Sequence, residues 1–468
     1  MIRIYLDWNV ISKLKTDEYS GIRSFLDANK DKISMPFSPA HFEDISKSDN
    51  PGNDKIHEDI ETMEHLCRNY YLAYDKEKDM ALPYIASPSV YYNQYKSSPT
   101  TISEVINPEN FEKFCGIDVI ESDPRIRQIL NMPVRMPELN IPESLPFYKL
   151  DSRQNEVITL KELILLMISI INKIMTDRET YKALRGTKGA MPIPNIEGSP
   201  SEIIPFLNSC FEKAGLEYNF MGLVGQALEC QKSDSFFMRF LTTYLLLDMF
   251  YKSDKLHKKG NNATNIVADA MHAYYAAYCD YFVTDDKRLA EKAAVLYKEF
   301  HINVPIISSK EIPERISPLL WQNTEHILDI IKDIVSSSYF DNRSEAYGVN
   351  ENDDEITWIV AFKRYYFNFF NYANVSLLKN NNVLIITMLR RFSCRSRYVF
   401  YNEVAQLLTL LSDTFGEIPE SLKKSIIECE KDFSCVWRTD DNRIAIQLSE
   451  DTDYKGRPKL TFVIDLMN

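Results

Sequence analysis

Several features are absent from this sequence, and each absence narrows the class of protein. The eight cysteines form no C-x-x-C pair and show no zinc-ligand spacing, so we expect scattered buried thiols in a reducing compartment. The longest apolar stretch, residues 163–171, is about half as long as a membrane span requires. The chain opens directly on a strand-like run, which leaves no room for a signal peptide. We therefore expect a soluble, cytoplasmic protein without membrane contact.

An excess of positive charge is also missing. The formal net charge is −13, which argues against non-specific wrapping of nucleic acid by the whole surface and leaves room only for a local basic groove. A length of 468 residues, 45% of them hydrophobic, predicts two or three folded domains.

The spacing of apolar residues indicates an α/β core that is interrupted and then followed by a different region. Residues 1–48 predict strands at 2–6 and 33–37, a helix over about 9–28, and a helix that opens at Ser38-Pro39. The pattern resumes over 262–308, with strands at 280–284 and 304–307 and helices at 265–279 and 286–299. Strand signals fade over 49–261, which we interpret as a mostly helical insertion.

Residues 310–468 predict an α+β domain that binds the substrate or a partner. A helix is expected at 318–336, further helices at 402–415 and 419–431, and strands at 433–438, 443–448 and 459–464.

Acidic residues follow the predicted strands of the α/β core. Asp7 ends the first strand, Asp285 and Asp286 end the strand at 280–284, and Asp269 opens the helix before it. Ligands of open α/β sheets collect beyond the carboxyl ends of the strands. Acids gathered there repel one another unless a divalent cation lies between them. The sequence therefore predicts a Mg²⁺ or Mn²⁺ site at this edge.

Three segments resemble the successive motifs of PIN-domain nucleases: Ile4–Val10, Ser38-x-x-x-x-Glu43 and Asp269–Asp286. The resemblance covers residues 1–48 and 262–308. It implies a three-layer PIN-like core with a mainly parallel sheet, and a metal-dependent endoribonuclease that acts on single-stranded or structured RNA, with DNA as a second substrate to test. The long insertion departs from the compact members of the family, as does Trp8, and both leave the choice of substrate open.

Carried over residue by residue, the resemblance implies catalytic, metal-binding acids at Asp7, Glu43, Asp269 and Asp286. It also implies that Asn9 and the Thr284 hydroxyl contact the substrate. Two choices between adjacent acids stay open, Glu43 or Asp44 and Asp285 or Asp286.

Other polar residues have two interpretations each. His272 either orients a phosphate or a ligand, or is a structural histidine packed near Tyr275 and Ala276, which we favour. Asp248, on an apolar stripe, is either a partnered buried acid or a further site acid.

Two basic segments are candidates for substrate contact. Residues 252–259 form a basic cluster, which is also typical of a solvated face. Residues 356–401 contain no Asp or Glu and interleave basic with aromatic side chains. That composition suits either an RNA platform, with Arg390 and Arg391 as contacts, or an ordinary sheet core and a protein partner.

The function that we expect is hydrolysis of RNA phosphodiester bonds by a Mg²⁺- or Mn²⁺-dependent nuclease. The resemblance to PIN-domain nucleases also implies that a core with an added insertion and C-terminal domain suits a toxin-like or phage-defence effector. The alternatives are a non-catalytic PIN-like scaffold that binds RNA or protein, and a small-molecule phosphohydrolase. A protein partner or a homo-oligomer stays open.

Overall fold

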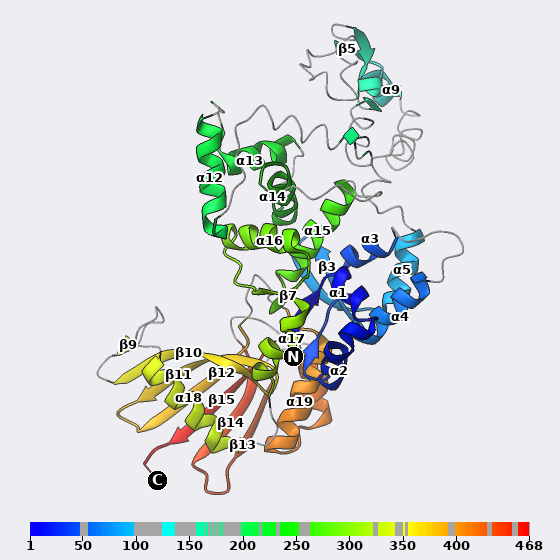
Figure 1. The fold of residues 1–468 in the computed structure, drawn as a ribbon. Helices are drawn as coiled ribbons and strands as arrows, with labels where there is room; N and C mark the ends of the chain where they lie inside the picture. Colours follow the sequence, from blue (N-terminus) through cyan, green and yellow to red (C-terminus); the bar gives the residue numbers. More distant parts are fainter. Residues whose placement is uncertain are drawn as a thin grey trace.

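The computed structural model describes residues 1–46, 55–97, 124–135, 156–163, 198–213, 218–230, 235–251, 263–321, 326–341, 350–351, 354–391, 398–427, 433–451 and 457–467, with a few single positions between them. Two main sheets organise this part of the chain (Figure 1). None of the helices described there is long and apolar enough to cross a membrane.

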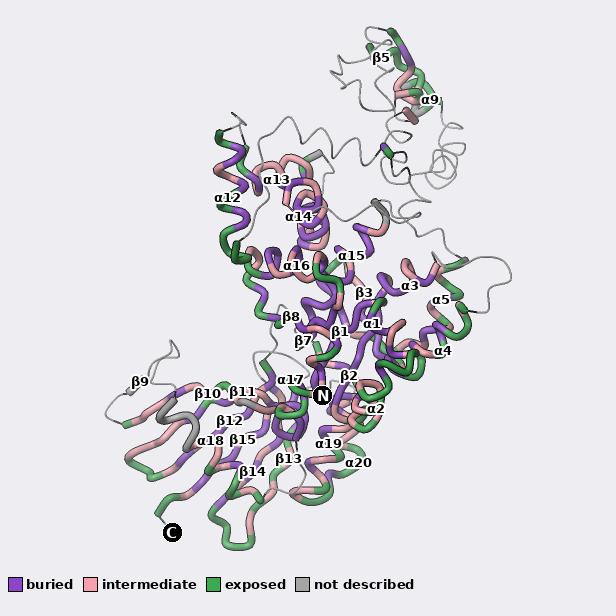
Figure 2. The backbone as a smooth tube through the Cα atoms, in the orientation of Figure 1, coloured by how far each residue is buried: buried purple, intermediate pink, exposed green. Residues whose placement is uncertain are grey.

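The first sheet is parallel and joins the two ends of the predicted α/β region. Its strands are β1 (Ile2–Leu6), β2 (Ile33–Ser34), β7 (Tyr281–Val283) and β8 (Ile306–Ile307), in the order β2-β1-β7-β8. Every residue of β1 is buried (Figure 2), as a central parallel strand covered on both faces requires. Leu6 pairs with Val283, so the residues that follow β1 and β7 meet at one edge. The expected mixed α/β class with a parallel sheet is confirmed.

Helices flank this sheet where the sequence predicts them, with one difference. They are α1 (Trp8–Lys13), α2 (Ser20–Ala28), α3 (Pro39–Ser46), α15 (Ala263–Ala276) and α16 (Lys287–Glu299). The single helix expected over 9–28 is interrupted, because Thr16 takes an extended backbone and a 3₁₀ turn, η1 (Asp17–Tyr19), follows it.

Residues 49–261 contain more than helices. The helices that the structure describes in this span are α4 (Lys55–Cys67), α5 (Pro88–Ser97), α9 (Pro124–Leu130), α12 (Pro200–Lys213), α13 (Phe220–Cys230) and α14 (Phe236–Phe250). Strands β3 (Tyr70–Asp75) and β4 (Met80–Ile85) form an antiparallel hairpin, and β5 (Pro133–Arg135) pairs with β6 (Val157–Thr159). The mostly helical prediction is therefore incomplete.

The hairpin β3–β4 belongs with the parallel sheet in space. Tyr71 of β3 forms a parallel bridge with Phe37, just beyond β2. Asp79, at the turn, accepts a hydrogen bond of 2.6 Å from the amide of Phe236, at the start of α14. Ring contacts run across residues 48 and 261, where the sequence suggested boundaries, because Phe37 packs on Tyr71 and Phe236 packs on Tyr274.

The C-terminal region is built on a seven-stranded antiparallel sheet. In spatial order its strands are β13 (Ser434–Arg438), β14 (Ile444–Glu450), β15 (Pro458–Asp465), β12 (Val383–Leu389), β11 (Phe370–Leu378), β10 (Glu355–Tyr366) and β9 (Asn350–Glu351). Helices α18 (Ile327–Asp341), α19 (Tyr401–Phe415) and α20 (Glu420–Ile427) pack into the core of this sheet. Short turns, η4 (Ser309–Glu311), α17 (Ile312–Ile316) and η5 (Ser317–Leu319), lead into it.

Two buried ion pairs fix this region to the parallel sheet. Arg3 of β1 contacts Glu403 of α19 at 2.7 Å, and Arg390, just after β12, contacts Asp280, just before β7, at 2.6 Å. Arg3 and Asp280 lie at the amino ends of their strands. The C-terminal region therefore docks at the edge of the sheet opposite the acidic residues.

Candidate active site

Asp7 occupies the carboxyl end of the central strand β1. Its side chain is buried, and its Oδ1 accepts a hydrogen bond of 2.8 Å from the amide of Val10. Through this bond Asp7 caps the N-terminus of α1. Its Oδ2 accepts a hydrogen bond from the hydroxyl of Thr284, which follows the neighbouring strand β7. Burial raises the pKa of Asp7 to about 6, and the hydrogen bond from Thr284 opposes that rise. The two strand ends thus hold a buried carboxylate that forms no ion pair with any residue that the structure describes.

Thr284 connects the two strand ends. Its hydroxyl donates to Asp7 and accepts from the amide of Asp286 at 3.0 Å. We expect Thr284→Val to lower the free energy of unfolding by about 1–3 kcal/mol, because both partners lose a hydrogen bond in a largely buried place. Urea denaturation measures this loss, with Thr284→Ser as the matched control that keeps the hydroxyl. Equal losses in both variants would show that the methyl group, not the hydroxyl, matters.

Asp286 faces solvent at the start of α16. Its Oδ1 accepts hydrogen bonds from the amides of Arg288 and Leu289, at 2.8 and 3.1 Å. A helix N-terminus stabilises a carboxylate in this place. The same acid therefore caps a helix and lies beside the Asp7–Thr284 contact.

Asp285 turns away from Asp286 and toward protein donors. Its Oδ2 lies 2.7 Å from Nζ of Lys13, and its Oδ1 accepts from the Ser309 amide at 2.9 Å. Burial alone would raise the pKa of Asp285, but the hydrogen bonds from Lys13 and Ser309 lower it. These contacts favour Asp286 over Asp285 as the acid open to a ligand.

His272 joins the acidic edge from α15. It is 1% exposed, its Nε2 lies 3.0 Å from Oδ2 of Asp44, and its Nδ1 lies 2.9 Å from the hydroxyl of Tyr5. Helix α15 packs against α3, which carries both Glu43 and Asp44. Asp269 does not open its helix as the sequence suggested, because α15 already begins at Ala263; it is partly buried in the middle of α15, one turn before His272. His272 is therefore hydrogen-bonded to a site acid in addition to being packed, which the apolar spacing alone did not indicate.

These acids approach one another without forming a closed metal site. The Asp44 carboxylate is near enough to contribute to the raised pKa of Asp7, after the larger effect of burial. Among the residues that the structure describes, no three His, Cys, Asp or Glu side chains are placed closely enough to hold one ion. Glu43 is partly buried on α3.

The predicted substrate contacts have different surroundings. Asn9 is exposed on α1. Arg390 is 4% exposed and is held by Asp280 and by the carbonyl oxygen of Phe369. Arg391 is exposed, with its guanidinium 5.6 Å from the ring centre of Tyr372.

Arg390 is therefore an interior ion-pair partner and not a surface contact. The aromatic residues of its segment also line the sheet core, among them Trp358, Tyr366 and Phe370. Burial of these rings favours the sheet-core interpretation of residues 356–401 over an RNA platform. The basic cluster at 252–259 lies outside the described residues, as do Arg395 and Arg397.

Asp248 is a partnered buried acid. It pairs with Lys292 of α16 at 2.9 Å, and both side chains are inaccessible to solvent. The further-site interpretation of Asp248 loses its basis.

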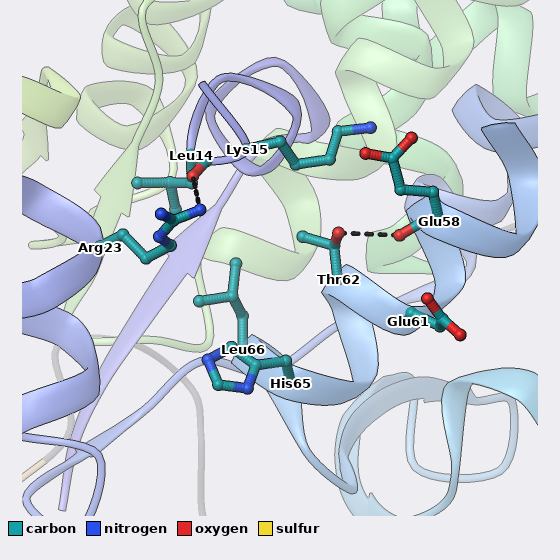
Figure 3. A pocket seen from close by; sticks show the side chains of 8 residues that line it. All are labelled: Leu14, Lys15, Arg23, Glu58, Glu61, Thr62, His65 and Leu66. Atoms are coloured by element: carbon teal, nitrogen blue, oxygen red, sulfur yellow. Dashed lines mark hydrogen bonds between the residues drawn. The ribbon is translucent and has the colours of Figure 1, made fainter. Parts of the chain in front are cut away.

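A separate pocket of about 280 Å³ lies beside α4 (Figure 3). Its lining residues are Leu14, Lys15, Arg23, Glu58, Glu61, Thr62, His65 and Leu66. None of the acids at the strand ends is among them, and Lys15 forms an ion pair with Asp59. This pocket is distinct from the acidic edge.

Comparisons with protein-family models, with curated proteins and with solved structures find no match, so a functional assignment depends on the geometry of the acidic edge.

Proposed function

We propose that this protein is a PIN-like, metal-dependent nuclease that hydrolyses RNA phosphodiester bonds. The observation that carries the proposal is the contact between Asp7 and Thr284 at the ends of two neighbouring parallel strands. A buried carboxylate is costly unless it gains a counter-charge. Its position beyond the strand ends is where open α/β sheets bind ligands.

The donor set suits a hard divalent cation. Carboxylate oxygens are the ligands that Mg²⁺ and Mn²⁺ prefer, and Asp7 has a pKa raised to about 6, chiefly by burial. A bound cation would favour the ionised form that burial opposes. Asp7, Asp269 and Asp286 would hold the cation, with a fourth carboxylate from Glu43 or Asp44. The described acids would have to draw closer to one another to do so.

The protein's own residues have definite tasks in this reaction. The cation would supply a water nucleophile at neutral pH and a charge that stabilises the leaving oxygen. Thr284 orients Asp7 through its hydroxyl, and the amide of Val10 fixes the second oxygen of Asp7. Lys13 and Ser309 hold Asp285 away from the reacting phosphate. These contacts fix the orientation of Asp7 and Asp285 before a substrate arrives, which lowers the cost of reaching the transition state.

Cleavage assays with controlled metal content test the proposal. Labelled single-stranded RNA, structured RNA and single-stranded DNA are incubated with the protein in Mn²⁺, in EDTA, and in EDTA followed by excess Mn²⁺. We expect RNA cleavage in Mn²⁺, none in EDTA, and recovery on addition of Mn²⁺. Asp413→Asn changes an exposed acid on α19 and is the charge-matched control for Asp7→Asn. It should cleave as the wild type does.

Other outcomes separate the alternatives. Cleavage that persists in EDTA would exclude the metal-dependent mechanism. Binding of RNA without cleavage under all conditions would support the scaffold. Hydrolysis of p-nitrophenyl phosphate without cleavage of any polymer would support the phosphohydrolase.

A further inference from the structure

A continuous chain of hydrogen bonds runs from the end of β1 to Asp44. It starts at the carbonyl oxygen of Leu6, the residue before Asp7. The groups that follow it in order are His41, the Ser38 hydroxyl, Tyr5, His272 and Asp44. All of these except Asp44 are buried. The chain links β1, α3 and α15, and three of the predicted metal ligands, Asp7, Glu43 and Asp269, lie on these elements or directly after them.

The tautomer at one end of this chain is set by the contacts of His41. Its Nε2 lies 2.9 Å from the carbonyl oxygen of Leu6, which can only accept, so this nitrogen carries a proton. Its Nδ1 accepts from the backbone amide of Ser38 at 3.1 Å, and an amide can only donate. Burial lowers the pKa of His41 to about 3. His41 is therefore a neutral imidazole with one defined tautomer.

The direction of the remaining bonds is set at Asp44. An ionised carboxylate can only accept, so Nε2 of His272 donates to Asp44 at 3.0 Å, and Nδ1 of His272 is left to accept from Tyr5 at 2.9 Å. The Ser38 hydroxyl, 2.6 Å from Tyr5 and 3.4 Å from Nδ1 of His41, is then the donor to the Tyr5 oxygen. Aligned hydrogen bonds polarise one another, so each one strengthens the next.

Asp44 differs from Glu43 in the face of α3 that it occupies. Adjacent residues of a helix are turned by about 100°, whereas Asp44 lies one turn after His41 and shares its face. The rings of His41 and His272 are in edge contact, with their centres 4.8 Å apart. Asp44 therefore projects toward α15, where Asp269 lies one turn before His272. The side chain of Asp44 is 20% exposed, which leaves it accessible to a ligand.

We propose that Asp44, and not Glu43, is the second carboxylate ligand of the cation, and that His272, held by Tyr5, positions it. The inference depends on the proposed metal-dependent function. Carboxylates that bind metals are themselves oriented by hydrogen bonds from a surrounding layer of residues. Loss of such a partner typically lowers metal affinity by about 10–100-fold.

Calorimetric titration with Mn²⁺ tests the ligand assignment without measuring activity. We expect Asp44→Asn to weaken Mn²⁺ binding by more than about 10-fold, and by more than Glu43→Gln does. His272→Phe keeps a flat ring without its hydrogen bonds, and Tyr5→Phe removes only the hydroxyl. Each should weaken binding by about 10-fold. A larger loss in Glu43→Gln, or wild-type affinity in Asp44→Asn, overturns the assignment.

Nitrogen chemical shifts of ¹⁵N-labelled histidine test the positioning chain directly. In the wild type, His41 and His272 should both carry their proton on Nε2. Tyr5→Phe should release the tautomer of His272 and leave that of His41 unchanged. A simple loss of packing would not produce this selective change. A proton on Nδ1 of His272 in the wild type overturns the direction of the chain.

The two levels of the hypothesis fail in different ways. If the wild type binds Mn²⁺ and cleaves RNA while Asp44→Asn behaves identically, the ligand assignment is refuted and the nuclease stands. If the wild type neither binds Mn²⁺ nor cleaves, the nuclease is refuted and the ligand assignment with it. Asp413→Asn again serves as the matched control, because its carboxylate is exposed on a distant helix.

Discussion

Asp7→Asn is expected to abolish cleavage of RNA and, in the same protein, to stabilise the metal-free fold at pH 8. Removing a residue that only orients a metal ligand typically costs up to about 100-fold in activity. Because Asp7 would bind the metal itself, the loss of activity should exceed about 100-fold. The gain in stability has a separate origin in the burial of the carboxylate. The two effects together distinguish a metal ligand from a residue that only maintains the fold.

The sign of the stability effect follows from the raised pKa of Asp7. Burial, the largest cause, raises that pKa from 3.8 to about 6, so the folded state favours the protonated acid. The cost of ionisation is absent below the unfolded pKa, grows as the pH rises from about 4 to 6, and is complete above pH 6. A shift of this size corresponds to about 3 kcal/mol.

Asparagine cannot ionise, and it caps a helix about as well as aspartate does. It fits less well opposite Thr284, whose hydroxyl donates to Asp7, and one lost hydrogen bond costs about 1 kcal/mol. The net gain at pH 8 should therefore be about 2 kcal/mol.

Urea denaturation in EDTA at pH 8 and pH 4 measures the difference. The advantage of Asp7→Asn should disappear at pH 4, where the wild-type acid is protonated in the folded state. Excess Mn²⁺ at pH 8 should stabilise the wild type and leave the variant unchanged. An identical shift at both pH values would show that ionisation of Asp7 is not its cause.

The sequence sufficed to predict the part of the site that local patterns encode. An apolar run such as Ile2–Leu6 can only be a strand or a buried helix segment. An acid directly after it, followed by helical spacing, is typical of an N-cap, as found at Asp7 and Asp286. These inferences need no knowledge of distant contacts.

Long-range partners could not be predicted in the same way. Nothing near Asp285 indicates that Lys13 and Ser309 would bind it, and nothing near Arg390 indicates burial against Asp280. Whether Glu43 or Asp44 is the predicted metal ligand depends on which side of α3 packs against α15. The hairpin β3–β4 was missed because its strands contain Leu, Ala and Met, which suit a helix, and Pro83, which argues against a strand. Each of these outcomes is decided by packing between segments that are far apart in the chain.

The second large effect is expected at the junction of the two regions, where Glu403→Gln should lower the free energy of unfolding by about 3–5 kcal/mol. Arg3 and Glu403 are 0% and 2% exposed, so removing the carboxylate charge leaves the buried Arg3 guanidinium without its ion-pair partner at 2.7 Å. Two hydrogen bonds join them, from Nε at 2.9 Å and from Nη2 at 2.7 Å. Urea denaturation at pH 7 measures the loss.

The free energy of unfolding at low pH should also depend on the ion pair between Arg3 and Glu403. Burial alone would raise the pKa of Glu403, but attraction to Arg3 and its hydrogen bonds lower it to about 2. The stabilisation is present above the unfolded pKa of about 4.3 and is lost as the pH falls from there through 2. Glu403→Gln should therefore lose most of its deficit relative to the wild type near pH 2.

The double variant Arg3→Met, Glu403→Leu separates the cost of an orphaned charge from the contribution of the pair. Replacing a buried ion pair by apolar residues is often nearly neutral, so the double variant should be more stable than Glu403→Gln. A double variant no more stable than Glu403→Gln would show that the pair itself, and not the orphaned arginine, determines the loss. Cleavage by the folded double variant should match the wild type, because this junction lies at the amino ends of β1 and β7 and the acids lie at their carboxyl ends.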